Sequence, residues 1–140
     1  MNKTKKILAW FYVVNWCGII FFLSSIPELK IEELGLWDLI LRKIAHLIEY
    51  LILSVLVSNA LFVSFNMKFL NSCLFSFVFS VIYAISDEIH QYFVPGRHFS
   101  LLDVFIDTMG IIFGIILWIK FLRYRIYKNH INLENKNLVL

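Results

Sequence analysis

The sequence is poor in the residues that build turns, disulfides and disordered segments. Its 140 residues include five glycines, two prolines and two cysteines. This composition excludes collagen-like repeats and argues against a disordered or loop-rich chain. Cys17 and Cys73 each lie inside an apolar run, so we predict packing side chains rather than a disulfide or a thiolate metal site.

Charged residues are also scarce, at 16% of the chain, whereas 60% of it is hydrophobic and 17% aromatic. The mean hydropathy is +0.76, and this composition is not that of a soluble globular domain. A helix needs about 20 apolar residues to cross the hydrocarbon core, and four stretches come close to that length: 7–26, 44–66, 69–86 and 101–122. We therefore predict an all-α, polytopic membrane protein built as a four-transmembrane-helix bundle.

The segments between these spans predict how they are joined. Residues 66–68 alone separate the second span from the third, which favours a tight antiparallel hairpin. Residues 31–41 mix acidic and apolar side chains, which indicates an interfacial segment before the second span or an extension of it. The first span is longer than a typical signal-peptide core, so we expect it to be retained. The expected parts are an N-terminus at 1–6, a membrane domain at 7–122 and a basic tail at 123–140.

Basic residues are divided unequally between the two sides of the predicted bundle. With four spans both termini share a side, and that side carries nine of the thirteen basic residues. They are Lys3, Lys5, Lys6, Lys68, Lys120, Arg123, Arg125, Lys128 and Lys136. Because positive residues stay on the cytoplasmic side during insertion, we expect both termini in the cytoplasm. The charge pattern indicates contact with membrane lipids and gives no case for nucleic acid.

Polar residues recur at helical spacing at the ends of the spans that face the opposite side. In span two they form a stripe of Asp38, Arg42, His46 and Glu49. In span three a common face carries Ser76, Ser80, Asp87 and Gln91, with Tyr83 and His90 at its margins. In span four Asp103, Asp107, Gly110 and Gly114 follow one another at intervals of three or four. Since ionisable groups inside a membrane avoid lipid, we expect these faces to pack inward, with the glycines allowing close helix contact.

The connection between spans three and four carries a turn and a helix start. Pro95 and Gly96 are a strong turn signal. Ser100 is well placed to cap span four, with Asp103 at the third position of a capping box. Arg97 precedes this helix start, where its guanidinium and backbone N–H groups are expected to hold a phosphate or carboxylate.

These motifs resemble the VanZ-like family of bacterial membrane proteins. The residues that carry the resemblance are HLIEY at 46–50, SDEIHQYFVPGR at 86–97, SLLDV at 100–104 with Gly110, and SSIP at 24–27. The resemblance implies a multi-pass protein of the bacterial cell membrane, and in some relatives an association with resistance to the glycopeptide teicoplanin. It also implies asparagine at position 107 in many relatives, which leaves open whether Asp107 acts as a charged or a neutral group. It does not supply a reaction.

Several chemical interpretations of the ionisable cluster remain open. His46 and Glu49 have a spacing that suits metal ligation, but a histidine hydrogen-bonded to a carboxylate is commoner, so we assign no metal ligands and leave cofactors open. A carboxylate pair between helices, such as Asp87 with Asp103 or Glu49 with Asp107, could share a proton. The alternative is a paired network with Arg97 and Lys43 that holds the bundle together. Glu88 is left as a structural or solvated charge.

Our first functional hypothesis is an outward-facing pocket that binds an anionic cell-envelope ligand such as a lipid-linked phosphate, and whether it also processes that ligand is left open. Any chemistry there would be acid–base or metal-assisted, with His46, Glu49, Asp87 and Asp103 as the catalytic candidates. The ligand-binding candidates are Lys43, Gln91, Arg97, Ser100 and Asp107. The alternatives are a non-catalytic scaffold that alters glycopeptide access and, more weakly, a proton-coupled transporter.

Overall fold

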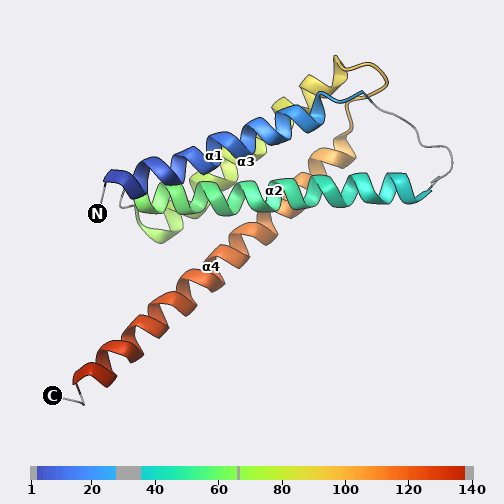
Figure 1. Cartoon of the computed structure of the whole chain (residues 1–140). Helices are drawn as coiled ribbons and strands as arrows, with labels where there is room; N and C mark the ends of the chain where they lie inside the picture. The colour runs from blue at the N-terminus through green and yellow to red at the C-terminus, as the bar shows by residue number, and fades with distance from the viewer. Residues whose placement is uncertain (1–2, 28–35, 66, 138–140) are drawn as a thin grey trace.

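The computed structural model of the chain describes residues 3–27, 36–65 and 67–137. These residues form four helices, drawn in Figure 1. The helices are α1 (Lys3–Ser24), α2 (Leu36–Phe65), α3 (Phe69–Tyr92) and α4 (Leu101–Asn137). Each is long and apolar enough to cross a membrane. The described chain is thus an all-α four-helix bundle, as the hydrophobic runs predict.

The helix bounds extend several of the predicted spans. α2 ends at Phe65 and α3 begins at Phe69, so the tight hairpin is confirmed. α2 begins at Leu36, which makes the second half of the 31–41 segment an extension of span two, while residues 31–35 lie outside the described residues. α4 continues without a break from the predicted span end at 122 to Asn137. Hydropathy marks where the apolar stretch ends, whereas the helix itself continues into polar sequence.

The packing of the bundle is centred on the pair α2 and α4, which have the most extensive contact of any two helices. Gly110 and Gly114 lie at this contact: an added Cβ would overlap the carbonyl oxygen of Leu47 at Gly110, and that of Leu51 at Gly114. The predicted close approach at both glycines is therefore confirmed, with α2 as the partner helix. Lipid provides no hydrophobic drive between helices, so close backbone approach of this kind is a main source of stability.

Helix α1 packs against the rest of the bundle through buried apolar side chains, and hydrogen bonds from tryptophan and tyrosine side chains also attach it. Trp10 Nε1 donates to Ser64 Oγ at 3.0 Å, and Trp16 Nε1 donates to the Glu49 carbonyl oxygen at 2.9 Å. The Tyr83 hydroxyl donates to the Cys17 carbonyl oxygen at 2.7 Å. These bonds tie α1 to both helices of the α2–α3 hairpin.

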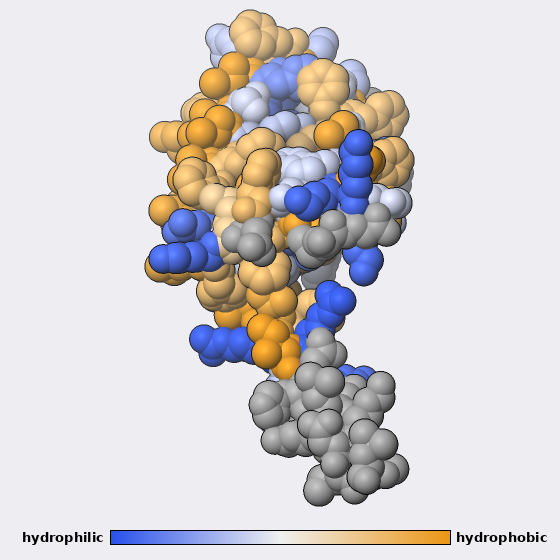
Figure 2. All heavy atoms as spheres, turned by 90° about the vertical axis from the view of Figure 1, so that its left-hand side faces the viewer, coloured by the Kyte–Doolittle hydropathy of each residue, from blue (hydrophilic) through white to orange (hydrophobic). Residues whose placement is uncertain are grey.

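The outer surface of the bundle is largely apolar. Large hydrophobic side chains are exposed along all four helices, among them Phe22, Leu70, Ile82 and Phe105. In the end-on view of Figure 2, apolar side chains dominate the flanks and hydrophilic groups stand out separately among them. Exposed apolar surface on this scale is what a hydrocarbon solvent requires.

The two ends of the bundle differ in what they bring together. Both termini and the α2–α3 connection lie at one end in Figure 1. At the other end, α1 and α3 finish while α2 and α4 begin. We call this second end the polar end, because the ionisable residues of α2, α3 and α4 are near it.

Candidate ligand-binding site at the polar end

Two adjoining cavities open at the polar end. The first has a volume of about 110 Å³ and the second of about 280 Å³. They share four lining residues, which are Arg42, His46, Gln91 and Arg97. Lys43, His98 and Asp103 also line the first cavity, whereas Glu49 also lines the second.

The stripe predicted on span two reaches these cavities. Arg42, His46 and Glu49 follow one another down the inner face of α2 and all line the second cavity. His46 Nδ1 lies 3.1 Å from Asp107 Oδ1 on α4. The side chain of Asp38 lies outside the described residues.

Lys43 and Asp103 form an ion pair between α2 and α4. Lys43 Nζ donates to Asp103 Oδ1 at 2.7 Å, and the two side chains are 37% and 22% exposed. The sequence predicts a capping box between Ser100 and Asp103, and the structure shows one of its two hydrogen bonds. The Asp103 N–H donates to Ser100 Oγ at 3.2 Å, so Ser100 caps α4 as predicted. The Asp103 carboxylate, however, turns to Lys43 instead of returning to the Ser100 N–H.

The Ser100 N–H instead donates to Glu88 Oε2 at 2.9 Å, so a carboxylate from α3 occupies the start of α4. A negative charge is favourable at this position because the helix dipole is positive there. Two donors that a phosphate could use at the start of α4, the N–H groups of Ser100 and Asp103, therefore already have acceptors within the protein.

Arg97 lines both cavities and also binds the end of α1. Its Nε donates to the Ile26 carbonyl oxygen at 3.0 Å, and its Nη2 donates to the Leu23 carbonyl oxygen at 3.2 Å. The preceding turn makes this possible, because Gly96 adopts a φ of 81° that favours glycine. These two bonds use two of the five N–H donors of the guanidinium.

The inner face of α3 is buried as the spacing predicts. Ser76, Ser80, Asp87 and Gln91 are all buried, and Gln91 Nε2 donates to Asp87 Oδ2 at 2.9 Å. At the margin of this face, His90 Nε2 lies 3.0 Å from Ser25 Oγ, and its ring stacks on Phe21 of α1. Gln91 lines both cavities, whereas Asp87 lines neither of them.

The structure thus gathers most of the predicted site residues. Six of the nine line the two cavities: Lys43, His46, Glu49, Gln91, Arg97 and Asp103. The other three act behind the cavity walls: Asp107 contacts His46, Asp87 holds Gln91, and Ser100 caps α4. These contacts place the residues, while their catalytic or binding roles remain predictions.

A family model described as VanZ/LLP1 matches residues 9–123 of the chain. The chain belongs to the VanZ/LLP1 family. Comparison with curated proteins and with solved structures found no match. The match to VanZ/LLP1 confirms the resemblance drawn from the motifs at 46–50, 86–97 and 100–104. The matched segment contains every residue of the candidate site.

The main residue of this VanZ/LLP1 site that the sequence analysis did not select is Glu88. It is fully buried, and it approaches both His46 and Asp107. Helical geometry separates it from Asp87 by about 100°, so the two were not expected to act as a pair, and Asp87 was preferred as the site candidate. Both are buried because the end of α3 is covered on two sides, by the rest of the bundle and by the start of α4.

Proposed function

We propose that this VanZ/LLP1 protein binds the phosphate-bearing headgroup of a lipid-linked cell-envelope molecule in the two cavities at the polar end. The observation that carries the proposal is the lining of these cavities by Arg42, Lys43 and Arg97, which come from two separate parts of the chain. Arginine and lysine side chains are the usual partners of phosphate oxygens, and arginine can bind two of them at once.

The charge balance of the lining supports an anionic headgroup. Three permanently cationic side chains line the cavities, against the two carboxylates of Glu49 and Asp103. Asp103 is already paired with Lys43. Among the lining side chains the cations thus outnumber the carboxylates by one, and a partly enclosed site strengthens their attraction for an incoming anion.

The size and the apolar part of the lining support a lipid-linked ligand. Sites for whole small molecules typically measure about 300–1,000 Å³, and each of these cavities is smaller. They suit a headgroup rather than a complete ligand. Leu23, Ile26 and Ala45 line the second cavity beside its polar residues, and they provide an apolar border along which a hydrocarbon chain can continue into the bilayer.

The proposal includes an orientation: the polar end faces outward, with both termini in the cytoplasm of a bacterial cell. The excess of basic residues near the termini supports it. Trp37 and Lys68 are exposed at opposite ends of α2 and its hairpin. In a chain whose native Cys17 and Cys73 are replaced by alanine, a cysteine at position 37 should react with an impermeant maleimide on intact cells. A cysteine at position 68 should react only after lysis, and the reverse pattern would invert the orientation.

Binding can be measured by native mass spectrometry of the full chain released from detergent micelles. A polyprenyl phosphate should bind, whereas the matched neutral polyprenol should not. Arg42→Gln should weaken binding of the phosphate by about 10- to 100-fold, because a hydrogen bond to a charged group contributes about 1.5–3 kcal/mol. Lys68→Gln removes a basic residue at the opposite end and should leave binding unchanged.

Equal affinity of the Arg42→Gln and Lys68→Gln proteins for the phosphate would contradict the proposed site. Release of product from the bound lipid would add an enzymatic role. Binding without release would fit the scaffold alternative, in which the occupied protein alters access of glycopeptides to the cell surface. Teicoplanin susceptibility of cells that express the two variants tests that alternative directly.

A further inference from the structure

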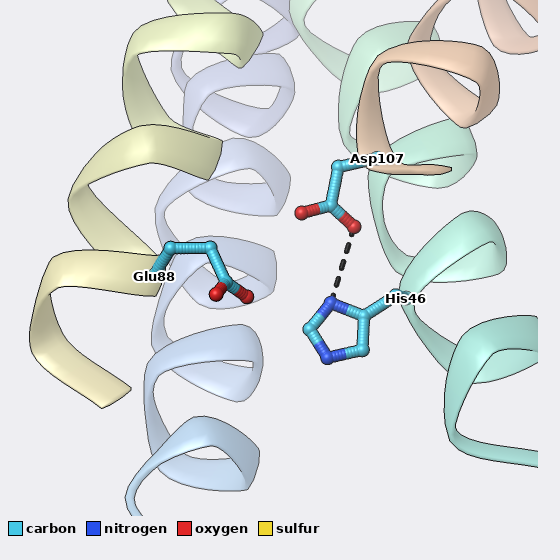
Figure 3. A group of neighbouring side chains, drawn as sticks. All are labelled: His46, Glu88 and Asp107. Carbon is cyan, nitrogen blue, oxygen red and sulfur yellow. Dashed lines mark hydrogen bonds and ion pairs between the residues drawn. The ribbon is translucent and has the colours of Figure 1, made fainter. Parts of the chain in front are cut away.

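Three ionisable side chains from three helices converge behind the wall of the two cavities. They are His46 of α2, Glu88 of α3 and Asp107 of α4, and each offers one ligand atom within 4.8 Å of the other two. Figure 3 shows the Glu88 carboxylate pointing toward the space beside His46 and Asp107, which are joined at 3.1 Å. Because the three side chains come from three separate helices, they meet inside the bundle and not on one outer surface.

Each of the two carboxylates is buried with one oxygen lacking a hydrogen-bond partner. Glu88 and Asp107 are both 0% exposed. Glu88 Oε2 accepts from the Ser100 N–H and Asp107 Oδ1 lies beside His46 Nδ1. Glu88 Oε1 and Asp107 Oδ2 have no partner among the described residues. A buried carboxylate oxygen without a partner costs free energy, so these two atoms point to a ligand that accepts their lone pairs.

The charges at this point identify the class of ligand. In the state that binds a metal ion, with both carboxylates ionised and the imidazole neutral, the three side chains carry a charge of about −2. One divalent cation balances that charge within the low-dielectric interior of the bundle. One nitrogen and two carboxylate oxygens form a ligand set suited to Zn²⁺ and Mn²⁺. Three protein ligands also leave a coordination position open, as in catalytic zinc sites.

We propose that His46, Glu88 and Asp107 form a binding site for one divalent transition-metal ion, Zn²⁺ or Mn²⁺. Two ligand atoms about 2.1 Å from one ion and about 110° apart lie roughly 3.4 Å from each other. His46 Nδ1 and Asp107 Oδ1 already have close to this separation, and an ion held by both Asp107 oxygens would also give Oδ2 the partner that it lacks among the described residues. Glu88 Oε1 approaches by rotation of the flexible Glu88 side chain, while Oε2 keeps its bond to Ser100, a supporting contact that orients the ligand.

This site connects to the cavities through His46, which lines both of them. An ion bound there would lie next to the proposed headgroup, where a Lewis acid can polarise a phosphoryl oxygen. That link rests on the proposed function, whereas the ion site itself depends only on the three side chains.

The test uses the purified full chain in detergent, stripped of metal with EDTA and without added lipid. Titration with Zn²⁺ and with Mn²⁺ in a calorimeter should give one ion per chain for at least one of them, with a rise in Tm on binding. Glu88→Gln should weaken binding more than about 100-fold, since it removes a ligand atom and its charge. Asp87→Asn changes the neighbouring buried acid, which is held by Gln91, and should keep the ion.

Wild-type protein that shows no saturable uptake of either ion at concentrations up to about 1 mM, where even weak protein sites for Ca²⁺ are filled, would overturn the proposal. Equal ion affinity of Glu88→Gln and Asp87→Asn would overturn it as well. If the Glu88→Gln protein does not fold, Asp107→Leu removes the candidate ligand on α4, and its ion affinity is compared with that of Asp87→Asn instead. Absence of ion binding by the wild-type protein, with polyprenyl phosphate binding retained, would refute the ion site alone. Ion binding by the wild-type protein without polyprenyl phosphate binding would refute the headgroup site alone.

Discussion

The polar end and the half of the bundle beyond it hold their helices together by different chemistry. At the polar end, contacts between helices are made by ionisable side chains, as in Lys43 with Asp103 and His46 with Asp107. In the other half, small side chains occupy many of the buried positions between helices, beside large apolar ones such as Val57 and Trp118. We call this the small-residue half, defined by Ser54, Ser58, Ser72, Ser76 and Gly114, of which the four serines are fully buried.

The difference predicts how substitutions should act in each half. Small residues give close contact without introducing a charge, so the small-residue half can be stable in lipid by packing alone. Charged side chains inside a membrane are energetically costly unless they are paired, and they are typical of sites that bind or transport a substrate or an ion. A substitution in the small-residue half should therefore destabilise the protein through steric overlap. A substitution at the polar end should act by leaving an ionisable side chain without its partner.

The largest effect is expected at the close contact of α2 with α4. Gly114→Leu should destabilise the protein by about 3 kcal/mol or more, because the new side chain meets the backbone of α2 and neither helix can yield cheaply. Gly18→Leu is the matched control, since an added Cβ at Gly18 meets nothing within 4 Å. Thermal unfolding in detergent measures both. Similar Tm values for the two variants would mean that α4 does not pack on α2 as described.

The second effect concerns Arg97, which joins the connection before α4 to the end of α1. Arg97→Ala should cost about 1–2 kcal/mol of stability, because it removes two hydrogen bonds from a charged donor at a partly exposed position. Arg97→Lys should recover part of the stability but less of the binding, since an ammonium lacks the planar fork of donors.

Tm and polyprenyl phosphate binding should be measured together on these two variants. A role in the ligand site predicts a loss of binding beyond the loss of stability. Binding and stability that fall in step would limit Arg97 to attaching α1, and full binding by a stable Arg97→Ala protein would remove it from the site.

A smaller effect is expected for the ion pair between Lys43 and Asp103. Both side chains are partly exposed, and pairs of this kind usually contribute about 1 kcal/mol or less. A double-mutant cycle with Lys43→Gln and Asp103→Asn, followed by thermal unfolding, isolates the coupling. A coupling that is unchanged in high salt would show that the pair is more shielded than its exposure indicates.

The smallest effect is the difference in stability expected between alanine substitutions at two serines of α3, Ser76 and Ser80. Ser76 Oγ donates to the Ser54 carbonyl oxygen at 2.9 Å, and hydrogen bonds between membrane helices average about 0.6 kcal/mol. Ser76→Ala should cost about that much. Ser80 Oγ is buried with no hydrogen-bond partner among the described residues, so Ser80→Ala should be neutral or slightly stabilising. A larger loss at Ser80 than at Ser76 would contradict the contacts described for α3.

Helical spacing was enough to predict much of this arrangement. The stripe Arg42, His46 and Glu49 and the inner face of α3 follow from the fact that charged and polar residues in a membrane helix must face protein. The same reasoning placed Gly110 and Gly114 against a helix, although it could not say which one. Spacing fixes a face of one helix but carries no information on its partner.

The parts that the sequence could not predict depend on how separate helices meet. Glu88 lies off the face defined by Asp87 and Gln91, and it is buried between the rest of the bundle and the returning chain at Ser100. Arg97 was expected to serve the start of α4, but the turn at Gly96 directs it to the end of α1. Both outcomes come from the path of the α3–α4 connection, which local sequence periodicity does not encode.

The dominance of the contact between α2 and α4 has a consequence for biosynthesis. α4 leaves the ribosome after the other three helices, when α2 has already entered the membrane with Lys43 and His46 in its sequence. Until α4 arrives, these two residues lack their partners Asp103 and Asp107. The nascent chain therefore holds unpaired polar groups at the bilayer for the time needed to synthesise about sixty further residues, and a chain truncated before α4 is expected to be a substrate for membrane proteases.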